Sequence, residues 1–190
     1  MGPTENAVAN EPYIFTGNVS ILDRGENYVV VDKPPSVLCH RSDWSGSGKG
    51  QTSKKDGPPE VPMLQRTREA TGERVNLIHR LDRGASGCLL MSFARSDDVY
   101  GNATAIMQKS MTQSSSTHKT YIALVRGEGI LKERNFRKEG WFEVDRPIKN
   151  ENGNLKNATS YFRFIAGQSN GNGTLDRPRA SLVLARIKTG

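Results

Sequence analysis

The chain contains 190 residues, of which 35% are apolar and 25% are charged. This length fits one domain that can bury a core of its own. Lys and Arg number 27 against 20 acidic residues, and the net charge of +7 favours a polyanionic partner such as nucleic acid. No stretch approaches the roughly 18 apolar residues of a membrane span, and the first residues lack the apolar core of a signal peptide. We therefore expect a monomeric intracellular protein without a membrane span, located in the cytoplasm or, in a eukaryote, in an organelle or the nucleus.

The first half of the chain alternates polar and strand-like segments. Residues 1–11 are polar and are expected to be disordered. Short strands are predicted at 13–15 and 19–22, and the β-branched run at 28–31 is typical of a central strand. Pro34 and Pro35 end that run because proline cannot donate to a ladder. Residues 41–60, rich in Ser, Gly, Pro and Lys, predict a flexible insertion within one domain.

The rest of the chain contains two predicted helices and further strands. Helices are predicted at 61–70, where Gly72 acts as a stop, and at 96–110, where Ser96 is the N-cap. Strands are predicted at 88–93, buried on both faces, and at 119–127, 157–166 and 181–188, with a Ser-rich loop at 112–117. Consecutive strands that outnumber helices indicate an α+β fold, in which helices and loops flank a mixed, mainly antiparallel central sheet.

Cysteine and histidine positions give no sign of a metal site. Cys39 and Cys88 both have apolar neighbours and do not form a C-x-x-C pair, so we expect two reduced thiols in the core. The three histidines lie far apart in the sequence, without metal-ligand spacing. We therefore expect no metal ion.

The most distinctive stretch is residues 76–91, in which a single carboxylate, Asp82, lies between Arg80 and Arg83. A Gly-Ala-Ser-Gly turn and an apolar strand follow it. Adjacent cations favour the ionised form of an aspartate, so Asp82 could act as a nucleophile or as a positioning group. The alternative is a surface cluster of charges that only holds a loop in place.

Three stretches in this order resemble the motifs of the RluA-type RNA pseudouridine synthases. The family pattern D-K-P-x-G-x-x-x-H corresponds to residues 32–40, and H-R-L-D-R-x-T-S-G-x-L-L corresponds to residues 79–90. The pattern K-x-Y-x-A-x-V-x-G corresponds to residues 119–127. Weaker similarity continues through 145–161 and 181–190, so the resemblance covers about residues 20–190. It implies the pseudouridine synthase fold and a catalytic domain over residues 12–190.

The chain departs from the family pattern at three places. Ser36 stands where the family usually has glycine, and Ala85 stands where threonine is common. Both residues are small, so we expect the two turns to form. The family's R-x-H-Q-I-R motif, whose last arginine pairs with the catalytic aspartate, does not appear before Gly190. We therefore expect the catalytic domain to be incomplete at its C-terminus.

The resemblance implies isomerisation of specific uridines to pseudouridine in structured RNA, either tRNA or rRNA. The enzyme would flip a uridine out of its helix, break the N1–C1′ bond, rotate the base and rejoin it through C5, without a cofactor. By analogy, Asp82 is the catalytic carboxylate, either as a nucleophile at C1′ or as a base at C2′. Arg80 would hold the flipped-out state, and Tyr121 would stack on the uracil and could take the C5 proton.

The other implied site residues bind substrate or support the site. Arg83 and Lys119 are candidates for phosphate contact or for holding Asp82. His79 is either a substrate-binding residue or a structural hydrogen-bonding residue. Lys33 is expected to be a solvated strand end with a secondary role in RNA binding.

Two alternatives remain open at the level of sequence. One is an inactive RNA-binding relative, or a fragment, with the same fold. The other is a hydrolase that uses Asp82 as one of two carboxylates, although no second acid lies in an equally marked motif. Within the family, residues 32–42 look closest to the tRNA-modifying branch related to TruC.

Overall fold

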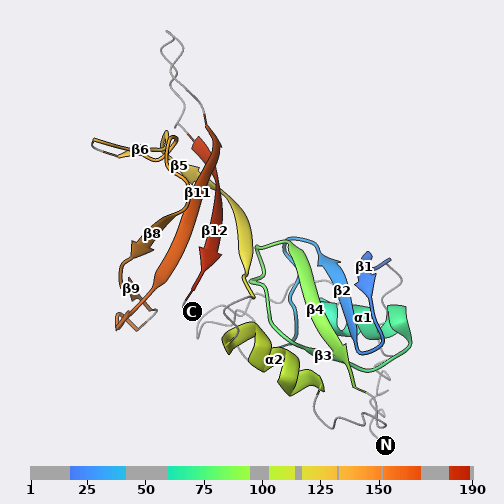
Figure 1. Ribbon diagram of the computed structural model, residues 1–190. Coiled ribbons are helices and arrows are strands. Elements are labelled where there is room, and N and C mark those ends of the chain that lie inside the picture. The colour runs from blue at the N-terminus through green and yellow to red at the C-terminus, as the bar shows by residue number, and fades with distance from the viewer. Residues whose placement is uncertain are drawn as a thin grey trace, which may run out of the picture. The chain divides into compact units, whose positions relative to one another are not determined.

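The computed structural model describes residues 18–41, 60–94, 103–113, 117–131, 133–150, 152–167 and 180–188 (Figure 1). The chain divides into two compact units, Met1–Ser114 and Ser115–Gly190. The predicted disordered start, the strand at 13–15 and the cap at Ser96 lie outside the described residues, as does all of the 41–60 insertion except its two end residues. Within the described residues, no helix is long and apolar enough to cross a membrane.

The first unit contains a four-stranded antiparallel sheet. Its strands, in sheet order, are β1 (Ile21–Arg24), β2 (Tyr28–Lys33), β4 (Gly87–Phe93) and β3 (Val75–Leu77). The strands predicted at 28–31 and 88–93 are confirmed as the two central ones, since long β-branched and apolar runs favour the interior of a sheet. The strand expected at 19–22 begins later, at Ile21.

The core of this unit lies on one face of the sheet. Alternate residues of β2 and β4 point into it, and Val29, Val31, Leu89 and Met91 are fully buried. Cys39 is buried as predicted, whereas the prediction of a core position for Cys88 is wrong. The alternation that buries Leu89 turns Cys88 to the other face, where it is exposed. Burial on both faces of β4 is found only toward its end.

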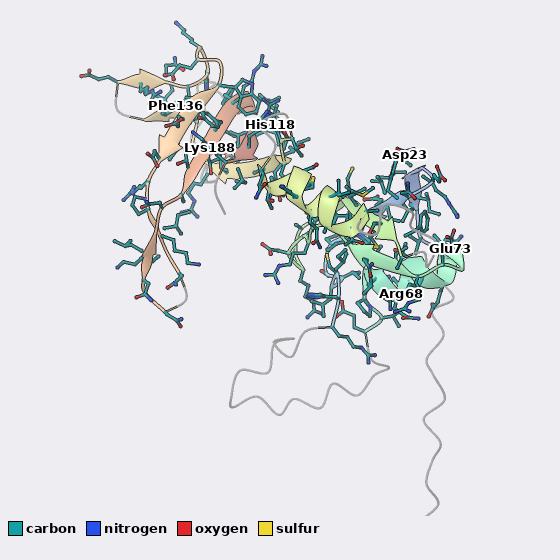
Figure 2. The ribbon with its side chains drawn as sticks, turned by 60° about the horizontal axis from the view of Figure 1, so that its bottom comes forward. Asp23, Arg68, Glu73, His118, Phe136 and Lys188 are labelled. Atoms are coloured by element: carbon teal, nitrogen blue, oxygen red, sulfur yellow. The ribbon has the colours of Figure 1, made fainter. Side chains whose placement is uncertain are left out.

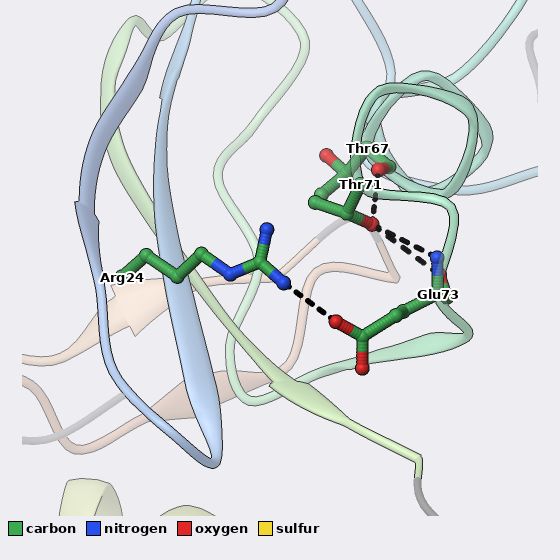
Figure 3. A network of polar contacts seen from close by, with 4 residues as sticks. All are labelled: Arg24, Thr67, Thr71 and Glu73. Atoms are coloured by element: carbon green, nitrogen blue, oxygen red, sulfur yellow. Dashed lines mark hydrogen bonds and ion pairs between the residues drawn. The ribbon is translucent and has the colours of Figure 1, made fainter.

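Helix α1 (Met63–Thr71) confirms the predicted helix at 61–70. Met63 packs in the core, and Gly72 ends the helix in the left-handed region at φ 70°, where its N–H donates to the carbonyl oxygen of Arg68. Figure 3 shows how this end is joined to β1: Arg24 contacts Glu73 at 2.6 Å, and the Thr71 hydroxyl donates to the carbonyl oxygen of Thr67.

Helix α2 (Ala103–Gln113) runs past the predicted end at Ser110, so the first residues expected in the Ser-rich loop are helical. The helix is joined to the sheet by polar contacts. The Thr104 hydroxyl lies 2.8 Å from the Ser92 hydroxyl and 3.2 Å from the Asn76 amide nitrogen, and Gln108 donates to the carbonyl oxygen of Leu77. These contacts explain why Ser92, a polar residue, is buried within β4.

The second unit contains a separate four-stranded antiparallel sheet and two short hairpins. The sheet consists, in order, of β5 (Thr120–Arg126), β12 (Ala180–Ile187), β11 (Thr159–Gly167) and β8 (Phe142–Asp145). The hairpins are β6 (Ile130–Leu131) with β7 (Arg134–Asn135), and β9 (Ile148–Lys149) with β10 (Leu155–Lys156). Antiparallel pairing in both units confirms the predicted α+β class.

One face of the second sheet is covered by aromatic rings, whereas the opposite face carries exposed aliphatic side chains. One face carries an aromatic cluster in which the rings of Phe136 (labelled in Figure 2) and Phe142 lie 4.4 Å apart, with Phe162 at 6.0 Å from Phe142. The register places Tyr121 of β5 on this face, since it pairs with Ala185, which pairs in turn with Phe162. Ile122 and Leu124 point to the opposite face and are 70% and 74% exposed.

Candidate active site

The Asp82 stretch forms the loop between β3 and β4 of the first unit. The Asp82 carbonyl oxygen accepts the N–H of Ala85 at 3.1 Å, so residues 82–85 form a tight turn, and Gly87, at φ 123°, begins β4. Asp82, Arg80 and Arg83 are all exposed at this turn. The carboxylate is therefore accessible to a ligand, as the resemblance implies.

Lys33 holds this loop from inside the protein. Its side chain is fully buried, and Nζ donates to the carbonyl oxygens of Pro34 at 3.0 Å, Arg83 at 3.2 Å and Ala85 at 2.6 Å. The expectation of a solvated strand end is wrong because the alternation of β2 places Lys33 on the core face. Burial lowers the pKa of the Lys33 ammonium. The nearby acidic groups of Cys39, Glu60 and Asp82 act in the opposite direction and raise it.

A second contact holds the backbone of Leu81, the residue directly before Asp82. The buried Cys39 thiol donates to the carbonyl oxygen of Leu81 at 3.2 Å, and its sulfur accepts the Leu81 N–H at 3.3 Å. Leu81 also packs against the core. Both backbone groups of Leu81 are thus satisfied by one side chain, which restricts the direction in which Asp82 leaves the loop.

Arg83 joins the Asp82 loop to the segment after β2. Its guanidinium contacts the Glu60 carboxylate at 2.9 Å, and its Nε donates to the carbonyl oxygen of Ser36 at 3.1 Å. The Ser36 N–H donates back to the carbonyl oxygen of Arg83 at 2.7 Å. The other Glu60 oxygen accepts the N–H of Leu38 at 2.8 Å. Arg83 therefore supports the loop, and its half-exposed side chain can still reach a phosphate.

His79 acts as a hydrogen-bonding residue at the base of the loop. Its Nε2 accepts the N–H of Leu90 at 3.1 Å, and the neighbouring Ile78 N–H donates to the carbonyl oxygen of Leu90. These bonds close the loop between its two flanking strands. Of the two interpretations that the sequence leaves open for His79, this geometry favours the structural one.

Arg80 differs from these supporting residues. Within the part of the chain that the structure describes, its exposed side chain makes no hydrogen bond or ion pair. A guanidinium in this state can bind a phosphate or a base without first breaking a contact. This is the state that the predicted substrate-binding role requires.

Tyr121 and Lys119 belong to the second unit. Tyr121 is half-buried on the aromatic face of the sheet, and Lys119 is half-buried just before β5. Asp82 belongs to the first unit, and a site shared between it and these two residues stays a prediction.

The structure adds two residues that sequence reasoning did not assign to the site, Cys39 and Glu60. Cys39 lies within residues 32–40, which match a family motif, but the sequence predicts only that its thiol is buried in the core. Glu60 lies at the end of the 41–60 insertion, where no motif marks it. Among the described residues, no group of three or more His, Cys, Asp or Glu could hold a metal ion.

We predict that Ser36→Gly stabilises the protein. Ser36 has φ 68°, a left-handed conformation that costs a residue with a Cβ about 1 kcal/mol relative to glycine. Glycine keeps both backbone bonds to Arg83 and removes this strain, so the free energy of unfolding in urea should rise by roughly 0.5 kcal/mol after the entropy cost of glycine. The matched change Ser86→Gly, at an exposed residue outside the left-handed region, should lower it. Equal effects at both positions would contradict the role of the φ angle.

Comparison with known proteins identifies the family of the chain. The RNA pseudouridylate synthase family model matches residues 27–190. tRNA pseudouridine synthase C of Yersinia pestis is 37% identical over 109 residues, which are 57% of this chain and 35% of that protein. The same enzyme of Haemophilus influenzae is 33% identical over 131 residues, which are 69% of this chain and 44% of that protein. The matched region thus spans less than half the length of these relatives.

Solved structures show the same fold. Human RNA pseudouridylate synthase domain containing 1 has a TM-score of 0.56 at 20% identity, covering 91% of this chain and 60% of the human chain. Human RNA pseudouridylate synthase domain containing 4 has a TM-score of 0.54 at 16% identity, covering 90% and 59%. The family match extends over most of the chain and includes the Asp82 loop. The chain therefore belongs to the RNA pseudouridylate synthase family.

Proposed function

We propose that this chain isomerises uridine to pseudouridine in RNA, with Asp82 as its catalytic carboxylate. The main support is one observation: Asp82 is exposed on a loop whose backbone is held from beneath by Lys33 and Cys39. A catalytic group gains most when its position is fixed before substrate arrives. The names of the relatives, tRNA pseudouridine synthase C, favour tRNA over rRNA as the substrate.

The proposed reaction needs one carboxylate and no cofactor. The N1–C1′ bond of a flipped-out uridine breaks, the uracil rotates, and a C5–C1′ bond forms. The C5 proton is then lost to a base and N1 regains a proton, so substrate and product are isomers. Asp82 acts either by attacking C1′ or by removing the C2′ proton, and both routes need an exposed, fixed carboxylate at the sugar.

The remaining residues divide into substrate contacts and supports. Arg80, two residues before the carboxylate, contacts the RNA from which the uridine has been flipped. Tyr121 stacks on the uracil and takes the C5 proton, and Lys119 contacts a phosphate. Arg83 contacts a phosphate with the part of its guanidinium that Glu60 leaves open. Lys33 and His79 act through the loop and are positioning residues.

We predict that Asp82→Asn abolishes the reaction while RNA binding persists. The amide keeps the size of the side chain but cannot act as nucleophile or base, so the rate should fall at least about a thousandfold. The measurement is tritium release from a tRNA transcript labelled at uridine C5. Asp23→Asn, at an exposed aspartate of β1, is the control and should leave the rate unchanged. Full activity of the Asp82 variant would contradict the proposal, and release by neither wild type nor variant with RNA bound would favour an inactive relative.

We predict that Tyr121→Phe lowers the maximal rate by about a hundredfold and leaves KM close to the wild-type value. The ring still stacks on the uracil, but the hydroxyl that takes the C5 proton is missing. Tyr161→Phe removes a hydroxyl from the opposite face of the same sheet and serves as the matched control. If the two variants lose activity equally, or if Tyr121→Phe changes only KM, the proton-transfer role is wrong.

A further inference from the structure

Glu60 links the Asp82 turn to the segment after β2. One oxygen of its carboxylate accepts the Leu38 N–H at 2.8 Å, and the other lies 2.9 Å from Nη2 of Arg83. The two side chains differ in exposure, since Glu60 is 28% exposed and Arg83 is 51% exposed. The carboxylate is therefore the more enclosed partner of this ion pair, and the guanidinium is the partner that a ligand can reach.

The start of α1 fixes the backbone next to Glu60. The following residue, Val61, is buried, and its carbonyl oxygen accepts the Nε–H of Arg66 at 2.7 Å. The Met63 N–H donates to the carbonyl oxygen of Leu38 at 2.8 Å, which joins the helix to the segment that Glu60 also contacts. Because the chain is held on this side, the carboxylate can keep a second side chain in one orientation.

Arg83 is held by one edge of its guanidinium. Nε donates to the carbonyl oxygen of Ser36 at 3.1 Å, and Nη2 contacts Glu60 at 2.9 Å. Nε and Nη2 form the side edge of the group, so both contacts lie on that edge. Among the described residues, Nη1 makes no hydrogen bond or ion pair. The end edge, formed by Nη1 and Nη2, therefore presents N–H groups that match two oxygens of a phosphate.

Backbone anchors make this ion pair better suited to positioning than an ordinary surface pair. An exposed ion pair alone stabilises a protein little, because ordering two long side chains costs entropy. Here the Leu38 N–H already orders the Glu60 carboxylate. The Ser36 carbonyl oxygen orders the Arg83 guanidinium in the same way. The orientation of Arg83 is thus set before a ligand arrives, which lowers the entropy cost of binding that ligand.

We propose that Glu60 is a positioning residue that presents the end edge of Arg83 to a phosphate of the substrate RNA. This inference rests on the proposed function, because that function makes RNA the substrate. Arg83 directly follows Asp82 in the turn, so the phosphate belongs to the RNA backbone close to the uridine on which Asp82 acts. Glu60 acts through Arg83 and does not touch the RNA.

The opposite role for Glu60 is competition with the phosphate for Arg83. A competing carboxylate would occupy the donors that the phosphate needs and would weaken RNA binding. The contacts favour positioning, because Glu60 uses the side edge of the guanidinium and leaves the end edge open. The two roles predict effects of opposite sign when the charge of Glu60 is removed.

The test is a double-mutant cycle on the full chain. Binding of an unmodified tRNA transcript is measured for the wild type, Glu60→Gln, Arg83→Gln and the double variant. Glutamine keeps an oxygen for the Leu38 N–H but loses the charge that holds Arg83. Arg83→Gln should weaken binding about tenfold in the wild type, and only about twofold in the Glu60→Gln background, where the guanidinium is no longer held. Glu60→Gln alone should weaken binding about fivefold, so the double variant should bind about as weakly as Arg83→Gln.

Glu73→Gln is the matched control. Glu73 contacts Arg24 at 2.6 Å, and its side chain is 30% exposed (Figure 3). The change therefore removes the same charge and a similarly exposed ion pair from the same unit, away from the Asp82 turn. In this background Arg83→Gln should still weaken tRNA binding about tenfold.

Three results of the binding cycle would overturn the proposal. An equal loss from Arg83→Gln with and without the Glu60 charge would show that Glu60 does not act through Arg83. A larger loss in the Glu60→Gln background, together with tighter binding by Glu60→Gln itself, would show competition. Unchanged tRNA affinity of Arg83→Gln in the wild-type background would show that this guanidinium does not contact the RNA.

Tritium release by the same samples separates this proposal from the proposed function. Glu60→Gln should raise the KM for tRNA more than it lowers the maximal rate, because the phosphate contact is already made in the bound state. A fall in the maximal rate at unchanged KM would indicate a purely structural role in the turn and would overturn the proposal. Absence of release in every sample with tRNA bound would contradict the isomerase, while the binding cycle would still decide the role of Glu60. Absence of tRNA binding by the wild type would overturn that role.

Discussion

The buried ammonium of Lys33 is the interaction on which the candidate site depends. An unpaired cation inside a protein is unfavourable, so the structure must place hydrogen-bond acceptors around it. It does so with three backbone carbonyl oxygens, two of which belong to the turn that carries Asp82. Because the buried Lys33 ammonium needs these acceptors, it constrains the backbone of the turn that carries Asp82, while the Asp82 side chain remains exposed.

The other residues of the site also fall into two groups: those that hold the loop in place and those that face solvent. Cys39, Glu60 and His79 bind backbone groups or other supporting residues, whereas Asp82 and Arg80 face solvent. A loop whose backbone is held in this way needs little rearrangement to meet a ligand, which the proposed reaction at a flipped-out uridine would require.

Sequence reasoning succeeded where a local pattern determines the structure. The β-branched run of β2, the apolar run of β4 and the stop at Gly72 all formed as predicted. It failed where the outcome depends on which face of a strand meets the core: Lys33 is buried and Cys88 exposed, although their neighbours suggested the reverse. The Glu60–Arg83 pair joins distant segments, so no spacing rule could reveal it. The family motif located Asp82, but not the residues that hold it.

Amide hydrogen exchange in Lys33→Met tests this account most directly. If Lys33 fixes the Asp82 turn, the N–H groups of Ala85 and Ser36, which donate to Asp82 and Arg83, should exchange at least about tenfold faster in the variant. Amides of the β2–β4 ladder should keep their protection, because methionine fills the same space in the core. Unchanged exchange at Ala85 and Ser36, or equal acceleration throughout the ladder, would contradict the claim that this lysine holds the Asp82 turn.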